Sequence, residues 1–232
     1  MSKKTHVPLK YLIPMLGAGY LALLLTVARG GYIACAASIA TLAVLHIRTL
    51  VQPRTIVSAI IAIFFGGVAF SVLSDGSVLQ QALEHVTNLF SGASYNERIH
   101  MYEIAIQAFM QHPWLGVGPG GFGPFASIHP YVIPADGWNI VNNEYLELLA
   151  ENGVLGLITM SALFISVIMR SLKALMYAYN AFLSATLAGL TAAFVGILVQ
   201  YNTFSILYIM HVWFVIGCMV ALQNIILSKQ HR

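Results

Sequence analysis

Charge is scarce in this chain of 232 residues, of which only 8% are Asp, Glu, Lys or Arg while 59% are hydrophobic. Soluble domains carry about 25% charged residues, so the composition excludes a soluble globular domain and indicates a membrane protein. The mean hydropathy of +0.80 indicates the same. The few basic residues form short patches at the ends of apolar segments. This pattern argues against nucleic acid as a partner and makes the lipid bilayer the expected one.

Cysteines and metal-binding motifs are also nearly absent. The two cysteines, Cys35 and Cys218, lie within apolar segments, where a thiol usually serves as a small packing residue. No spacing of His and Cys matches a zinc site, and no loop motif for a hard cation is present. We therefore expect neither a metal ion nor another cofactor.

Acidic residues are missing outside a single stretch. All 8 of them lie between residues 74 and 152, whereas all but two of the 11 Lys and Arg residues lie in four other short patches. These patches are Lys3, Lys4 and Lys10; Arg48 and Arg54; Arg170 and Lys173; and Lys229 and Arg232. Lys and Arg are enriched on the cytoplasmic side of membrane proteins. The basic patches are therefore predicted to be cytoplasmic and the acidic stretch extracytoplasmic.

Long apolar segments separate these patches, and six of them reach the roughly 17–25 residues that a membrane-spanning helix needs. They cover about residues 8–28, 31–47, 56–73, 154–169, 182–201 and 205–227. The charges place both termini and the turns at 48–54 and 170–181 in the cytoplasm, with a tight outer turn at Arg29–Gly30. The predicted fold is all-α, a polytopic transmembrane helical bundle of about six spans. Residues 1–232 form one membrane domain, and residues 74–152 form a large structured extracytoplasmic loop between spans three and four.

The loop is predicted to contain an amphipathic helix. Ser94 followed by Glu97 forms a capping box typical of a helix N-terminus, and Pro113 ends the helical pattern. Apolar residues recur between these positions at helical spacing, at Ile99, Tyr102, Ile106 and Phe109. We expect this helix to lie along the membrane surface or to pack on the spans.

Five glycines follow within residues 116–123. The segment is not a P-loop, because no Gly-Lys-Ser/Thr follows it. It is either a multi-turn loop that needs positive φ angles or a place where the backbone closely approaches a ligand. In the second case Gly118 and Gly121 are candidate substrate-binding positions.

A second loop helix is predicted to begin with Asn142 or Asn143 as its N-cap and to end at Asn152 and Gly153. One face of it carries three acids at positions i, i+3 and i+7, namely Glu144, Glu147 and Glu151. Such a face is usually solvated. Crowded carboxylates also raise one another's pKa, which suits a general base.

Arg29 and Arg98 are the two bases on the predicted outer side, which carries every acid of the chain. Each has an ordinary interpretation: Arg29 as a helix-end anchor, and Arg98 as a surface residue paired with Glu97 or Glu103. An arginine fork also binds phosphate through two parallel hydrogen bonds and stays charged. Together the two arginines are candidate ligands for a pyrophosphate at the outer membrane surface.

Three segments resemble motifs of the O-antigen ligase superfamily, and they occur in the family's order over nearly the whole chain. Residues 26–30, Thr-Val-Ala-Arg-Gly, resemble its T-x-S-R-G turn. Residues 96–122, from Asn-Glu-Arg through Ala-Ile-Gln-Ala-Phe to His-Pro-Trp-Leu-Gly-Val-Gly and Gly-Phe, resemble its R…W…A…P-x-x-G-x-G-x-x-x-F loop. Residues 142–153, Asn-Asn-Glu-Tyr-Leu-Glu-Leu-Leu-Ala-Glu-Asn-Gly, resemble its H-N-x-Y-L-x-L-L-x-E-x-G element.

The resemblance implies inverting, metal-independent glycosyl transfer from a polyprenyl-diphosphate-linked glycan donor at the outer face of the bacterial inner membrane. The acceptor is the lipid A–core in a ligase, another repeat unit, a glycan, in a polymerase, and a protein in other members. Arg29 and Arg98 would hold the diphosphate, because cations stabilise the charge that develops on the leaving group. Asn143, Gly118 and Gly121 would be further substrate-binding residues.

The chain departs from the family at Asn142, which stands where the family has a histidine. An amide cannot act as a base, so the departure shifts the expected activity from a ligase toward a polymerase or another branch. Asn142 is then predicted to orient a substrate, with Glu144 assisting as the catalytic base. His129 is an alternative base, and a reaction without a strong base is a third possibility.

Two interpretations lie outside this activity, a membrane transporter and an inactive fragment. Transporters tend to place ionisable groups near the bilayer midplane, whereas the interiors of the predicted spans contain none of Asp, Glu, Lys and Arg. Polar chemistry is concentrated in the outer loop instead, which favours chemistry at the membrane surface. Because family members usually have about twice as many spans, the chain resembles their C-terminal half.

Overall fold

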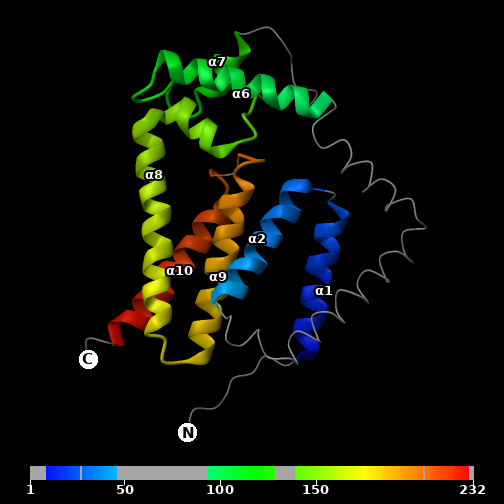
Figure 1. Ribbon diagram of the computed structural model, residues 1–232, viewed down its shortest axis with the longest axis vertical. Helices are drawn as coiled ribbons and strands as arrows, with labels where there is room; N and C mark the ends of the chain where they lie inside the picture. The colour runs from blue at the N-terminus through cyan, green and yellow to red at the C-terminus, as the bar shows by residue number, and fades with distance from the viewer. Residues whose placement is uncertain (1–8, 27, 46–92, 129–138, 206, 230–232) are drawn as a thin grey trace, which may run out of the picture.

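The computed structural model describes residues 9–26, 28–45, 93–128, 139–205 and 207–229, and these ranges contain helices and no strand (Figure 1). The helices are α1 (Leu9–Leu25), α2 (Arg29–Leu45), α6 (Ala93–Gln111), α7 (Phe122–Ser127), α8 (Glu144–Met176), α9 (Ala181–Gln200) and α10 (Met210–Ser228). By length and composition, α8, α9 and α10 can each cross a membrane, and α1 and α2 hold shorter apolar stretches. The prediction of an all-α membrane protein is confirmed. The predicted third span at 56–73 and the turn at 48–54 lie outside the described residues.

Helix α8 consists of two arms that meet at Gly153, where φ is 64° and ψ is −167°. The predicted end of the second loop helix is therefore a kink, and the chain continues directly into the predicted fourth span. The second arm starts at Val154 and has roughly 23 residues, which makes it about 34 Å long and long enough to cross a bilayer. The first arm, residues 144–152, precedes this membrane-spanning arm.

The predicted turn at 170–181 is wrong in its extent, because Arg170 and Lys173 lie within α8 and the turn is confined to residues 177–180. The stretch from Arg170 to Met176 contains no Gly or Pro that would stop a helix. Long basic side chains also carry their charge away from the helix axis, so their presence does not require the helix to end.

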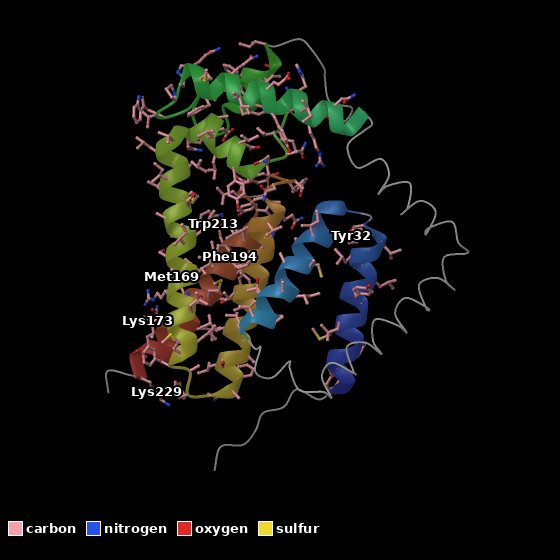
Figure 2. All side chains as sticks on the ribbon, in the orientation of Figure 1. Tyr32, Met169, Lys173, Phe194, Trp213 and Lys229 are labelled. Carbon is pink, nitrogen blue, oxygen red and sulfur yellow. The ribbon has the colours of Figure 1, made fainter. Side chains whose placement is uncertain are left out.

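Helices α8, α9 and α10 share one apolar core. Its largest contacts are between aromatic rings: Phe164 of α8 meets Phe194 of α9 edge to face, with centroids 5.7 Å apart, and lies 6.1 Å from the ring of Tyr201. Phe194 is labelled in Figure 2. All three rings are buried, so this cluster fixes α9 against α8 near the end of α9.

Small residues let α2 pack closely along α9. A Cβ atom at Gly196 of α9 would collide with the Ser38 side chain and would lie 2.9 Å from the Ala34 carbonyl of α2. A Cβ atom at Gly30 would likewise collide with the side chain of Thr203, just after α9. Close approach of backbones at small residues is typical of membrane helices. It places the start of α2 beside the connection between α9 and α10, residues 201–209.

The described part of the predicted outer loop has its own core, formed by α6, α7 and the first arm of α8. Its buried apolar residues are Met101, Ile104, Ala105, Ala108, Phe122, Ala126, Val141 and Ala150. The apolar face predicted for α6 is wrong in phase, because Ile99 and Ile106 are exposed. Alanines, which contribute little to a hydrophobic pattern in the sequence, form much of the buried face of α6. Helix α6 also includes Ser94, so it begins earlier than the capping box predicts, and it ends before Pro113 as predicted.

The two ends of the bundle differ in charge. Figure 1 shows α6 and α7 lying across the end at which α2 begins and α9 finishes. Figure 2 shows Lys173 and Lys229 at the opposite end. The first arm of α8, with its three glutamates, belongs to the α6 end. Among the described residues these glutamates are therefore separated from Lys173 and Lys229, while Arg29 and Arg98 share the acidic end.

Candidate functional site

A cleft with a volume of about 680 Å³ lies at the α6 end of the bundle. The first arm of α8, the glycine-rich segment, the 201–209 connection and α10 all contribute to it. Glu144, Glu147 and Glu151 line it together, which confirms that they share one face of the helix. Met160 and Trp213 contribute to an apolar side. The cleft therefore combines carboxylates with an aromatic ring, a pairing suited to a ligand with both hydroxyl groups and apolar surface.

Glu151 holds the glycine-rich segment in place. Its two carboxylate oxygens accept hydrogen bonds from the backbone N–H groups of Gly120, at 2.9 Å, and Phe122, at 3.2 Å. Its backbone carbonyl accepts another from the Gly118 N–H at 2.9 Å. A carboxylate that accepts two N–H bonds is a strong anchor because these bonds are charge-assisted. Glu151 thus shapes one wall of the cleft.

Two glycines allow this wall to lie directly against the kink of α8. A Cβ atom at Gly116 would collide with the backbone of Glu151, and one at Gly153 would collide with the backbone of Trp114. Both residues have positive φ angles, 67° and 64°, which disfavour any residue with a Cβ atom. A hydrogen bond of 2.9 Å from the Val154 N–H to the Pro113 carbonyl closes the contact.

Glu144 holds the opposite wall of the cleft. The side chain is buried, and its Oε2 atom accepts a hydrogen bond from the Leu207 N–H at 2.9 Å. The backbone N–H of Glu144 donates to the Tyr201 carbonyl at 2.8 Å. The Leu207 carbonyl accepts a bond of 2.7 Å from Nε1 of Trp213, in the first turn of α10. The 201–209 connection is therefore tied to both α8 and α10.

Glu147 lies between the other two glutamates and is partly buried. Its Oε2 atom accepts a long hydrogen bond, 3.3 Å, from the Val141 N–H. Burial is the largest influence on the pKa of Glu147 and raises it above the ordinary value. The nearby Ser205 hydroxyl and the Val141 N–H lower this pKa, and the charge of Glu151 raises it. The net effect is a raised pKa, so Glu147 gains a proton more readily than an exposed glutamate.

The two asparagines before α8 have different roles. Asn143 is the N-cap, as one of the predicted alternatives has it, and its Oδ1 atom accepts hydrogen bonds from Tyr145 N–H and Leu146 N–H. Its Nδ2 atom donates to the Asn202 carbonyl at 3.5 Å. Asn142 has a φ of 55°, a left-handed conformation that Asn and His adopt more readily than most residues. Within the described residues its amide has no hydrogen-bond partner, so the amide is free to contact a ligand.

Of the other predicted site residues with functional side chains, the structure describes the side chain of Arg98 but not those of Arg29 and His129. Arg29 is the first residue of α2 rather than part of a turn, and its side chain lies outside the described residues. Arg98 is partly exposed on α6 and forms no ion pair with Glu97, Glu103 or any other described residue. His129 also lies outside the described residues.

Gly118 and Gly121 do not line the cleft themselves, whereas Pro119, Gly120 and Gly123 of the same segment do. Gly118 has a φ of 97°, and a Cβ atom at Gly121 would lie 2.6 Å from the Val117 carbonyl. Both glycines therefore shape the wall. Among the side chains that the structure describes, no three of His, Cys, Asp and Glu are arranged to hold a metal ion.

Sequence reasoning missed several contributors to the cleft, among them Leu207 and Trp213. Leu207 acts through its backbone, which leaves no signal in side-chain identity. A tryptophan near the start of an apolar span is usually an interfacial anchor, so Trp213 did not stand out. The anchoring role of Glu151 was also missed, although its spacing to Glu144 and Glu147 placed it correctly on their face.

The fold and the site define a membrane protein with a carboxylate-lined cleft at one end of a helical bundle. A sequence model of the O-antigen ligase family matches residues 14–161. This match covers more than half of the chain, so the chain belongs to the O-antigen ligase family. The matched region includes Arg29, Arg98 and all three cleft glutamates. It supports a function of the O-antigen ligase or polymerase type, with lipid-linked glycans as substrates. No curated protein matches the chain.

Proposed function

We propose that the chain transfers a glycan from a polyprenyl-diphosphate donor to an acceptor hydroxyl at the outer face of the bacterial inner membrane. One observation carries the proposal: the start of α2, with Arg29, lies at the same end of the bundle as the carboxylate-lined cleft. Few contacts separate the start of α2 from the cleft. Gly30 packs against Thr203, and the carbonyl of the neighbouring Asn202 contacts the N-cap of α8. This proximity supports a cationic donor site beside the anionic cleft.

In this proposal the diphosphate of the donor binds to Arg29 and Arg98. The first backbone N–H groups of a helix have no partner within the helix, and the helix dipole favours an anion there. Arg29 adds a full positive charge at the start of α2, and Arg98 on α6 has no carboxylate partner among the described residues. Breaking the bond to the sugar leaves charge on the diphosphate, and cations at that position lower the barrier.

In this proposal the acceptor binds near the N-terminus of α8. Asn142 orients it through the free side-chain amide, and Asn143 supports Asn142 by fixing the start of α8. Glu144 assists from the wall of the cleft, while Gly118 and Gly121 shape the facing wall. His129 stays an alternative base. In a ligase the acceptor is a lipid-linked core, and in a polymerase it is another repeat unit.

The polymerase is the second candidate, and Asn142 favours it because the family's histidine is absent there. The two activities differ in their products. A polymerase gives a ladder of glycan lengths on the polyprenyl carrier, whereas a ligase moves a finished glycan to a different lipid. Gel analysis of the lipid-linked and transferred glycans from the source bacterium separates these outcomes.

The donor assignment is tested with conservative arginine variants. Purified protein is added to membrane vesicles from source cells that lack it, so that the native donor and acceptor are present. Arg29→Lys and Arg98→Lys keep the charge and lose the fork, and each should slow transfer by about 10²–10³-fold. Arg170→Lys, at the other end of the bundle, is the control. Wild-type rates in both lysine variants at normal protein levels would refute the arginine clamp. Movement of the lipid-linked glycan across the membrane without bond cleavage would favour a transporter.

A further inference from the structure

We infer that the cleft is the acceptor-sugar subsite and that Glu147 accepts the proton of the attacking hydroxyl. This inference rests on the proposed function and specifies which residue performs the step that the family's histidine would otherwise provide. It transfers the role of base from Glu144 to a neighbour one helical turn later, on the evidence of what each carboxylate already contacts.

The charge of the cleft selects the acceptor over the donor. Three carboxylates line it, and like charges brought together are unfavourable, so a diphosphate is excluded from it. Sugar hydroxyls, in contrast, donate hydrogen bonds to carboxylates. Trp213 and Met160 supply apolar surface for the C–H faces of a sugar ring. A neutral sugar is therefore the ligand class that this lining fits.

The three carboxylates differ in the backbone hydrogen bonds that they already accept. Both oxygens of Glu151 accept backbone N–H bonds, at 2.9 and 3.2 Å, and the buried Glu144 accepts one at 2.9 Å. Moving either carboxylate would release a wall of the cleft. Among the described residues, Glu147 accepts only one backbone bond, which is long at 3.3 Å. Glu147 is therefore the carboxylate that can turn to a substrate at the smallest cost.

The step balances as a single displacement. The acceptor hydroxyl oxygen forms a bond to the anomeric carbon of the donor, and the bond from that carbon to the diphosphate oxygen breaks. The electron pair of the broken bond leaves with the polyprenyl diphosphate. The hydroxyl proton passes to the Glu147 carboxylate, which later releases it to water.

The pH dependence follows from the surroundings of Glu147. The titratable groups that line the cleft with it are Glu144 and Glu151 on α8 and Tyr208 on the 201–209 connection. Burial raises the pKa of Glu147. A base works only in its deprotonated form, so transfer should be present above this raised pKa and be lost as the pH falls through it.

The test compares Glu147→Gln with Glu144→Gln and Glu103→Gln in the same vesicle assay. Glu103 is an exposed control on α6. Because general base catalysis contributes about 10²–10⁴-fold, Glu147→Gln should lose at least ~10²-fold in rate while keeping the wild-type midpoint of heat unfolding. Its residual transfer should lack the acidic limb of the pH profile. Glu103→Gln should match the wild type.

A second variant separates a base from a merely structural residue. The Glu147 carboxylate reaches the N–H of Val141, directly before Asn142, and the left-handed backbone at Asn142 also suits histidine. Adding Asn142→His to Glu147→Gln should restore part of the transfer, with an acidic limb near the histidine pKa of about 6.5.

The outcomes are distinct. Near-normal transfer by Glu147→Gln, retention of the wild-type acidic limb in that variant, or no recovery in a folded double variant each overturns the assignment of Glu147. A wild-type protein that transfers no glycan contradicts the proposed function itself. A larger rate loss in a folded Glu144→Gln than in Glu147→Gln returns the role of base to Glu144.

Discussion

The two ends of the helical bundle use charge in opposite ways. At the acidic end, Glu144 and Glu151 accept hydrogen bonds from the backbone of irregular segments and hold those segments in place. At the basic end, Arg170 donates to Asn224 at 2.6 Å and Lys229 lies 4.0 Å above the ring of Tyr179. These basic contacts join side chains on exposed surfaces. The comparison indicates that carboxylates hold irregular segments in place at the acidic end, whereas the described basic side chains at the other end make only surface contacts.

The largest contrast predicted between the ends is their location on opposite sides of the membrane. Truncated chains are fused to a phosphatase that is active only outside the cytoplasm. A fusion after Ser127 should be active and one after Tyr179 inactive, because Arg170, Lys173 and Lys229 gather at the second end. An inactive fusion after Ser127 together with an active fusion after Tyr179 would show that the proposed topology is reversed.

The next largest effect is expected where two backbones touch. Gly153→Ala introduces a Cβ atom against the Trp114 backbone at a φ of 64°, and should destabilise the acidic end by roughly 2–5 kcal/mol. The midpoint of heat unfolding in detergent measures this. Gly217→Ala is the matched control in α10, because a Cβ atom there meets nothing within 4 Å. Equal midpoints for the two variants would contradict the close contact.

A smaller loss should follow from weakening the carboxylate anchor. Glu151→Gln removes the charge that strengthens the bonds from Gly120 and Phe122 N–H, and hydrogen bonds to charged groups contribute about 1.5–3 kcal/mol. Protease cleavage within residues 116–123 should become faster, while Glu103→Gln leaves it unchanged. An unaltered cleavage rate in Glu151→Gln would show that the glycine-rich segment holds its position without this carboxylate.

The smallest effect is expected at the basic end. Lys229→Ala removes the contact of the Lys229 ammonium with the Tyr179 ring, which at an exposed site contributes less than about 1 kcal/mol. The midpoint of heat unfolding should shift little, and transfer should be unchanged. A large loss in either measurement would erase the contrast between the two ends.

Patterns that depend on side-chain type were predictable from sequence. Apolar length located α9, α10 and the start of the membrane-spanning arm of α8 to within a few residues. Charge distribution separated the three cleft glutamates from Lys173 and Lys229. The N-cap at Asn143 and the shared face of the three glutamates also followed from local rules, because caps and helical spacing involve only nearby residues. The donor arginines and the catalytic roles stay predictions.

Features that depend on tertiary packing were not predictable. The kink at Gly153 lies against the backbone of Trp114, so a break that was expected to end a helix instead joins two arms. The buried face of α6 was predicted wrongly because alanines form much of it, and they are buried by packing against α7 and the first arm of α8. The burial of Glu144 depends on Leu207, which is distant in sequence, so an acidic face expected to be solvated became the lining of a cleft.

The bond between Trp213 and Leu207 gives the molecule an internal spectroscopic probe. The indole of Trp213 lines the cleft, and its N–H donates to the carbonyl of the residue whose own N–H is bound by Glu144. Any ligand that enters the cleft or shifts the 201–209 connection changes the surroundings of this indole. Emission from Trp213, isolated by replacing Trp114 and Trp138 with phenylalanine, would thus report occupancy in real time, before any glycosidic bond is made.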